Sequence, residues 1–397
     1  MKAKDSVKNY DSKIREYTNY SYRQSKNACK NYGTRPAGGE NEKELQKHLV
    51  KELESCATTV KTEEFSFAKT SSLSENLFTL VFVALAVLLA LLDCFGILGN
   101  SSLPATGVAV LVLLGYANIF TGFTSKLLAK KLTAENIYAV READKEAKKR
   151  LILLANSDSA ERRKFNTTPF AIISAVGFVV ILVAVFLNAS LDLFSKYAAL
   201  KYASLALIVF VPVAAVPLFA DKNEYSDGAS KNLSGSFASI AVLKYLKDNN
   251  IEMPSAEICI LITSAHEADC AGAKAFIKAH AEEFSDIPTI CVGIDSIAFD
   301  EKGLSVIKGK NNEKSIAFLT EGAEDASVEI SDCPLQGKYL PDAVAFANAG
   351  IDCCTITSLA ENYEKEPDTH EDMKVKTIES ALKTVVSGLF IYEENEN

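Results

Sequence analysis

Hydrophobic residues follow two patterns along this chain. In four long blocks they are almost continuous, at 77–98, 104–122, 169–189 and roughly 198–220. Each block approaches the ~20 residues that an α-helix needs to cross about 30 Å of hydrocarbon. A core helix of a soluble protein is seldom apolar on all sides over this length. The pattern therefore predicts four transmembrane helices, which form two hairpins because the connections within each pair are short.

Elsewhere the apolar residues are periodic, as in a soluble domain. Helical spacing over 39–56 and 236–246 predicts amphipathic helices. Alternation over 60–67 and a short apolar run at 258–262 predict strands. The polar, tyrosine-rich residues 1–35 predict a further helix against the domain or the inner leaflet. Alternating helices and strands predict an α/β domain with a mixed, mostly parallel sheet and helices on both faces.

The two hairpins interrupt this α/β pattern. We expect hairpins at 77–122 and 169–220 and one soluble domain assembled from residues 1–76, 123–168 and 221–397. In the middle segment, two strands are predicted around a charged turn. The last segment is the main part of the domain.

The distribution of basic residues predicts the orientation. The segment 123–168 between the hairpins holds eleven Lys and Arg, whereas the connections 99–103 and 190–197 carry only Lys196. Basic residues near membrane ends favour the cytoplasmic side. With an even number of spans, the sequence predicts a multi-pass protein of the lipid bilayer whose soluble domain is cytoplasmic.

Composition and missing motifs exclude several classes of function. A net charge of −9 and a pI near 5.2 argue against general nucleic-acid binding. Nine cysteines without a cleavable signal fit a reducing compartment, and Cys353 and Cys354 are expected to be buried, inert thiols. The sequence has no phosphate-binding loop, dinucleotide fingerprint, Cys-x-x-Cys or nucleophile elbow.

Candidate chemistry is concentrated in residues 226–276, which read as glycine-rich turn, amphipathic helix, buried strand and acidic loop. His266 and Glu267 come just after the predicted strand. In α/β sheets, ligands bind at such strand ends. An acid/base pair or a metal ligand is therefore expected there.

The sequence resembles the di-zinc aminopeptidases of metallopeptidase family 28 in the order of its motifs. These motifs are GASKNLSG (228–235), a predicted helix, ILITSAHEADCAGAKAF (260–276) and TICVGIDSIA (289–298). That family's pattern is a Gly-Ala turn with Asp-Asn-x-Ser-Gly, a strand ending in Glu-Glu and a strand ending in Asp. The resemblance extends to 31–55, similar to the family's Arg-Pro-x-Gly opening helix, and to 341–356. It implies a zinc-exopeptidase fold outside the hairpins.

The resemblance also implies that key metal ligands are substituted. Asn156 stands where the family has the histidine of His-x-Asp, with Asp158 retained as a supporting residue. Lys231 stands at the bridging aspartate and is followed by the expected Asn232. A neutral amide is a poor zinc ligand, and a lysine repels two dications. These degenerate positions predict that the family's two-metal hydrolysis is impaired.

At the other positions the family's Glu-Glu pair reads His266-Glu267, and Asp295 is retained. Asp368 stands at the last ligand, a histidine in the family, and His370 follows two residues later. His266 is thus a candidate base. Glu267, Asp295, Asp368 and His370 are candidate ligands for one zinc ion; the alternative is that no metal is bound.

Two functions are compatible with these residues. One is a membrane-anchored pseudopeptidase whose domain binds a peptide or protein or acts as a scaffold, since function depends on the site and not on the fold. The alternative is an active metallo-aminopeptidase with a rebuilt, mononuclear site. Convergence of Glu267, Asp295 and Asp368 or His370 on one point would favour the enzyme. The substrate, partner and oligomeric state stay open.

Overall fold

A computed structural model describes residues 2–69, 72–98, 103–121, 127–162, 168–219, 224–299, 303–334, 336–337, 339, 341–359 and 368–395. The chain forms two compact units, which we call the α/β unit and the helical unit. The α/β unit comprises Met1–Phe67, Leu132–Glu161 and Tyr225–Asn397. The helical unit comprises Ala68–Lys131 and Arg162–Glu224.

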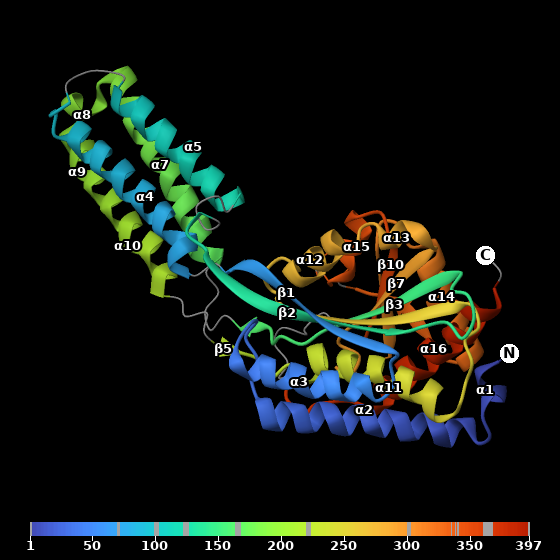
Figure 1. The fold of residues 1–397 in the computed structure, drawn as a ribbon. Helices are drawn as coiled ribbons and strands as arrows, with labels where there is room; N and C mark the ends of the chain where they lie inside the picture. Colours follow the sequence, from blue (N-terminus) through green and yellow to red (C-terminus); the bar gives the residue numbers. More distant parts are fainter. Residues whose placement is uncertain are drawn as a thin grey trace. The chain divides into compact units, whose positions relative to one another are not determined.

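The α/β unit is built on an eight-stranded sheet with the order β1-β2-β6-β3-β7-β10-β8-β9 (Figure 1). Its strands are β1 Thr59–Lys69, β2 Lys130–Arg141, β3 Lys149–Asn156, β6 Ala256–Thr263, β7 Thr289–Ile294, β8 Leu304–Lys308, β9 Ile330–Asp332 and β10 Asp352–Thr357. Strands β6, β3, β7 and β10 run parallel, and β2 and β8 are antiparallel to their neighbours β6 and β10. Two short strands, β4 (Glu161–Arg162) and β5 (Glu224–Tyr225), pair separately. The predicted mixed, mostly parallel sheet is confirmed.

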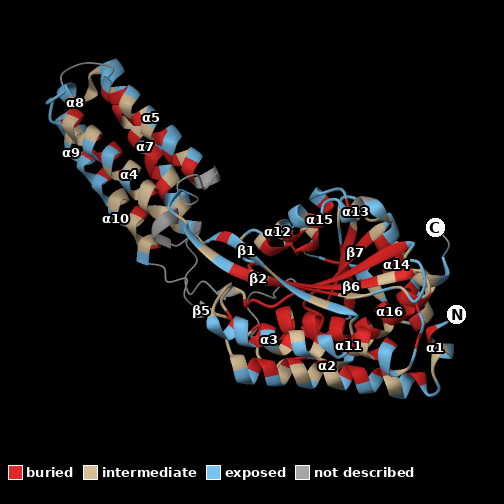
Figure 2. Ribbon diagram, in the orientation of Figure 1, coloured by how far each residue is buried: buried red, intermediate tan, exposed pale blue. Residues whose placement is uncertain are grey.

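Helices cover both faces of this sheet because its central strands are apolar on both sides. All eight residues of β3 are buried, and buried residues are concentrated on the central strands (Figure 2). Alternate side chains of β3 enter different cores: Leu151 and Leu153 one, Ile152 and Leu154 the other. The first core is covered by α2 (Tyr10–Tyr32), α3 (Glu40–Glu54), α11 (Ser234–Asp248), α14 (Glu313–Ala326) and α16 (Val375–Glu394). The second is covered by α12 (Ala271–Ala279), α13 (Glu283–Asp286) and α15 (Ala343–Asn348).

The polar N-terminal segment forms α1 (Ala3–Ser6) and the long helix α2. Of its predicted locations, the structure places α2 against the domain, where it contacts α11 and α16. Tyr10, Ile14 and Tyr17 are buried, and the Tyr17 hydroxyl donates to Asp248 at 3.1 Å. The tyrosines therefore supply both apolar surface and polar contacts in this layer.

The two strands predicted around a charged turn are β2 and β3, but they are not neighbours in the sheet. Strand β6 lies between them, antiparallel to β2 and parallel to β3. Every residue of β6 except Glu257 is buried. This central position gives an almost wholly apolar strand a neighbour on each side, and it brings the end of β6 beside the end of β3.

The helical unit contains the four apolar blocks. They form α4 (Ser72–Cys94), α5 (Leu103–Thr121), α7 (Thr168–Leu191), and a broken run of α8 (Leu193–Lys196), α9 (Ala198–Ser204), η1 (Leu205–Val209), α10 (Phe210–Ala215) and η2 (Val216–Phe219). Asn76–Cys94, Pro169–Leu191 and Ala198–Phe219 are long and apolar enough to cross a membrane. The remaining apolar helix, Leu103–Asn118, is shorter over the residues described. Three of the four predicted spans thus meet the length requirement, which fits membrane association.

All nine cysteines are free and buried. Cys353 and Cys354 lie in β10, where burial raises the pKa of both thiols. A thiol with a raised pKa is a poor nucleophile, as expected for an inert core residue.

Candidate functional site

Polar residues meet where the parallel strands β3, β6 and β7 end. Asn156 is the last residue of β3, Thr263 the last of β6, and Asp295 follows β7 directly. His266 comes three residues after β6. Because neighbouring parallel strands end at one edge of the sheet, these residues lie at the same edge.

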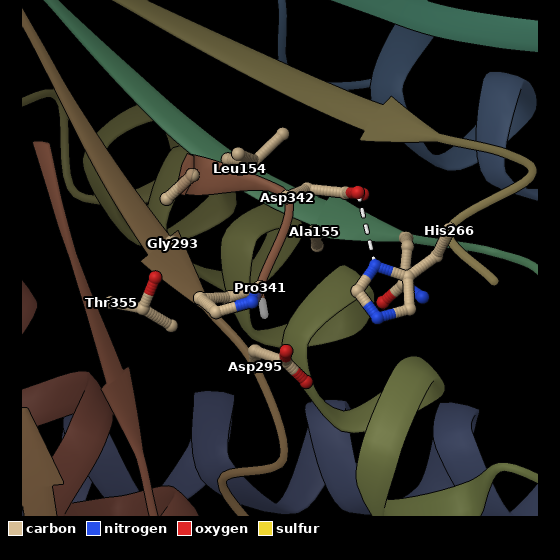
Figure 3. Close-up of a pocket in the computed structure, with 10 residues that line it drawn as sticks. Leu154, Ala155, His266, Gly293, Asp295, Pro341, Asp342 and Thr355 are labelled. Atoms are coloured by element: carbon tan, nitrogen blue, oxygen red, sulfur yellow. Dashed lines mark hydrogen bonds and ion pairs between the residues drawn. The ribbon is translucent and has the colours of Figure 1, made fainter. Parts of the chain in front are cut away.

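His266 is paired with an aspartate that the sequence analysis did not identify. Its Nδ1 lies 3.0 Å from Oδ1 of Asp342, directly before α15 (Figure 3). The other Asp342 oxygen accepts a hydrogen bond from the Thr263 hydroxyl. The backbone N–H of His266 donates to Asp158 Oδ2 at 3.0 Å. The side chains of His266 and Asp342 are only 10% and 6% exposed, so this pair is largely shielded from water.

The pairing changes how both groups ionise. Burial lowers the pKa of His266, but the facing Asp342 carboxylate outweighs burial and raises this pKa well above its ordinary value. Burial raises the pKa of Asp342, but His266 outweighs burial and lowers it. Both shifts favour an imidazolium that faces a carboxylate. A protonated imidazole cannot accept a proton, which weakens the case for His266 as a general base.

Cys270 completes a cluster with this pair. One ligand atom each from His266, Cys270 and Asp342 lies within 4.8 Å of the other two. In the described part of the chain, no other group of three or more His, Cys, Asp or Glu side chains brings ligand atoms so close together. Ala265, Asp269 and Cys270 all have positive φ, so the backbone turns sharply in the loop from β6 to α12.

Asp295 lies beside the cluster. Its Oδ2 accepts the Tyr339 hydroxyl at 2.7 Å and its Oδ1 accepts the Ser296 hydroxyl at 2.8 Å. Burial raises the pKa of Asp295. Together with His266, Asp342 and Asn156 it lines a cavity of about 10 Å³, in which roughly one water molecule fits (Figure 3).

Asp368 is used in a different way. Its Oδ1 accepts the backbone N–H of Ser230 at 2.6 Å, and its Oδ2 accepts that of Lys231 at 3.4 Å. It thus binds the first turn of η3 (Ala229–Leu233), a π-helical turn that leads into α11. Burial raises the pKa of Asp368, although the backbone N–H groups and the Lys231 charge act in the opposite direction. Both carboxylate oxygens serve the fold.

The other predicted ligands lie apart. Glu267 is exposed to solvent, although the side chain of its neighbour His266 is only 10% exposed. The His370 side chain is 22% exposed, with its Nε2 4.0 Å from a carboxylate oxygen of the exposed Glu371. Within the described residues, Glu267, Asp295, Asp368 and His370 do not form a group with ligand atoms within 4.8 Å of one another.

Supporting residues lie behind the site. Arg35 is fully buried and donates from Nε to the Ser157 carbonyl at 3.1 Å. Glu42 accepts the Ser157 hydroxyl at 2.7 Å. Burial, reinforced by the Glu42 charge, raises the pKa of Asp158 well above its ordinary value. Asn232 is buried in η3. These residues fix the loops that carry the site.

Sequence reasoning did not identify Cys270, Asp342 or Tyr339 as site residues. Cys270 had one available signal, its position four residues after His266, which is close to one helical turn. Asp342 and Tyr339 lie in a loop far along the chain, where no periodicity reports which side chains reach the sheet edge. Their placement depends on the tertiary fold.

Comparisons with known proteins agree with the fold. The sequence model of Peptidase family M28 matches residues 215–388. An aminopeptidase from Aneurinibacillus sp. strain AM-1 has a TM-score of 0.59 at 12% identity, over 96% of this chain and 95% of that one. A zinc aminopeptidase from Bacillus subtilis gives 0.56 at 13%, over 94% and 95%. A glutaminyl cyclase from Fimbriiglobus ruber gives 0.56 at 12%, over 94% of each chain. Comparison with curated proteins gave no match.

The predicted resemblance to family M28 zinc aminopeptidases is thus confirmed at the level of the fold. The neighbours include both aminopeptidases and a cyclase, so the fold does not select one activity. A pair of zinc ions at the family's positions does not fit this chain. Asn156 is a neutral amide, Lys231 is a cation, and Asp368 already accepts two backbone N–H groups.

Proposed function

We propose that this protein is a membrane-anchored pseudopeptidase, in which the α/β unit has the family's fold but does not hydrolyse peptides. The helical unit anchors it in the bilayer. The α/β unit serves as a binding module or scaffold for a peptide or protein partner at the membrane surface. The observation that carries this proposal is the contact of Asp368 with the Ser230–Lys231 backbone, because it fills the place of a metal ligand with a structural bond.

Electrostatics at this contact supports the proposal. A two-metal site needs anions that hold two dications about 3.5–4 Å apart. Here a lysine stands at the bridging position, next to a carboxylate that is already engaged. The charge of Lys231 opposes binding of two dications at this position.

Orientation forms a second part of the proposal. We place the α/β unit on the cytoplasmic side, because basic residues are concentrated in 123–168 between the two hairpins. Nine free, buried thiols fit a reducing compartment. Protease digestion of sealed vesicles tests this placement: the α/β unit should be cut in inside-out vesicles and protected in right-side-out vesicles, and the reverse result contradicts it.

A peptide-hydrolysis assay tests the loss of activity. The purified full chain in detergent is incubated with peptides of varied N-terminal residue, N-terminal glutamine included, with and without added zinc. The zinc aminopeptidase from Bacillus subtilis serves as the positive control. We expect no released amino acid and no cyclised product above the buffer background.

Zinc-dependent turnover would overturn the proposal in favour of the rebuilt aminopeptidase. Glu267→Ala then shows which site is responsible. Turnover that is lost in this variant would assign catalysis to the family's ligand position, whereas turnover that is retained would assign it to another group.

A further inference from the structure

We propose that His266, Cys270 and Asp342 bind a single zinc ion at a position different from the family's two-metal site. The cluster joins the loop after β6, the start of α12 and the residue before α15. Thiolate, imidazole and carboxylate are the three ligand types that zinc takes in proteins. The ion does not depend on hydrolytic activity, so it is compatible with a pseudopeptidase.

The three ligand atoms lie close enough for one tetrahedral ion to draw them together. Zinc–ligand distances of about 2.0–2.3 Å place neighbouring ligand atoms roughly 3.3–3.7 Å apart. The three atoms here lie within 4.8 Å of one another, and Nδ1 of His266 is 3.0 Å from Oδ1 of Asp342. If these two atoms move apart by a few tenths of an ångström, their separation reaches the value expected for two ligands of one zinc ion. The ion would replace the proton that they now share.

The surroundings hold the ligands in place. The Thr263 hydroxyl donates to the Asp342 oxygen that does not face the imidazole, which is the kind of outer bond that orients a carboxylate toward a metal. Asp158 accepts a hydrogen bond from the backbone N–H of His266. Cys270 has positive φ just before α12, which constrains the direction of its Cα–Cβ bond. The three ligands are thus pre-oriented by groups that do not themselves contact the ion.

Two of the three proposed ligands border the small cavity. His266 and Asp342 line it together with Asp295, and about 10 Å³ accommodates roughly one water molecule. Three protein ligands and one water are also the coordination of catalytic zinc sites. We assign the ion a structural role because it would tie the β6–α12 loop to the segment that precedes α15.

Metal analysis of the full chain in detergent tests this site. The protein is stripped with a chelator, reloaded with zinc or cobalt(II), desalted and measured by elemental analysis and absorption. We expect about one zinc per chain and a near-ultraviolet thiolate-to-cobalt band in the cobalt form. In Cys270→Ala the band should disappear and zinc affinity should fall about tenfold or more. Asp342→Asn should also weaken zinc binding.

Two variants serve as matched controls. Cys56→Ala removes another buried thiol that is not in the cluster, and Glu267→Ala removes the exposed carboxylate next to His266. Both should keep the zinc and the cobalt band. Absence of metal from the reloaded wild-type chain, or a cobalt form without a thiolate band, overturns the proposal. Both measurements use the wild-type chain, so they do not depend on whether a variant folds.

Zinc that survives Cys270→Ala but is lost in Glu267→Ala would also overturn it, in favour of the family's position. The outcome is separable from the proposed function. Peptide turnover disproves the pseudopeptidase without affecting the thiolate band, and a missing metal disproves the zinc site without creating turnover.

Discussion

The two sides of the site use their carboxylates differently. On one side, Asp368 gives both oxygens to backbone N–H groups of η3. On the other, Asp342 faces the His266 ring and the Thr263 hydroxyl. Backbone N–H groups in a helical turn cannot turn away from their acceptor, whereas a proton between two side chains can be exchanged for a metal. The partners of a carboxylate therefore decide whether it holds the fold or is available for a ligand.

The largest expected effect comes from removing Asp368. Asp368→Ala leaves two backbone N–H groups of a buried turn without their acceptor. Each buried unsatisfied polar group costs about 1–3 kcal/mol, so the free energy of unfolding should fall by at least this amount. Thermal unfolding of the full chain in detergent measures the loss.

Glu371→Ala is the matched control, because Glu371 is an exposed acid three residues away. Its substitution should change the unfolding free energy by less than about 0.5 kcal/mol. If Asp368→Ala were no more damaging than Glu371→Ala, the contact with the η3 turn would not stabilise the fold, and Asp368 would again be a candidate ligand.

The fold itself was largely predictable from sequence. Helix α11 and strand β6 follow directly from the apolar spacing over 236–246 and 258–262, since periodicity reports local structure and burial. The insertion of β6 between β2 and β3 was not predicted. The order of strands in a sheet depends on which apolar surfaces pack together in the folded protein. A long connection between two strands does not force them to be neighbours.

The site was predictable only where it lies next to a predicted strand. His266 and Asp295 follow β6 and β7, so their location at the sheet edge came from the strand pattern. Glu267 directly follows His266 but is exposed. In a tightly turning loop, consecutive side chains point in different directions, so sequence adjacency does not place both at the site. Asp342 reaches the site from a loop about 75 residues later, which local patterns do not report.

The next largest effect is expected in the pH dependence of stability, through the buried acid Glu42. Burial raises the pKa of Glu42, more than its bonds from the Ser157 hydroxyl and the Gly38 N–H lower it. The folded state therefore binds this proton more tightly than the unfolded state does. The corresponding stability is fully present below the ordinary glutamate pKa and is lost as pH rises through the raised value.

Glu42→Gln should remove this part of the pH dependence. As pH rises above the ordinary glutamate pKa, the melting temperature of the wild type should fall more steeply than that of the variant. Glu44→Gln, an exposed position of the same helix, should keep the wild-type slope. Parallel curves for the wild type and Glu42→Gln would show that Glu42 is ionised at little cost.

The smallest expected effect is at His370, on the Asp368 side. Its ring is partly exposed, and its ion pair with the exposed Glu371 spans 4.0 Å, so this pair contributes little to stability. His370→Ala should change the free energy of unfolding by less than about 0.5 kcal/mol and leave the zinc content unchanged. Elemental analysis and thermal unfolding of the same preparation check both. Loss of zinc with Cys270 intact would move the metal to the Asp368 side, and the division between a structural carboxylate and a ligand carboxylate would no longer hold.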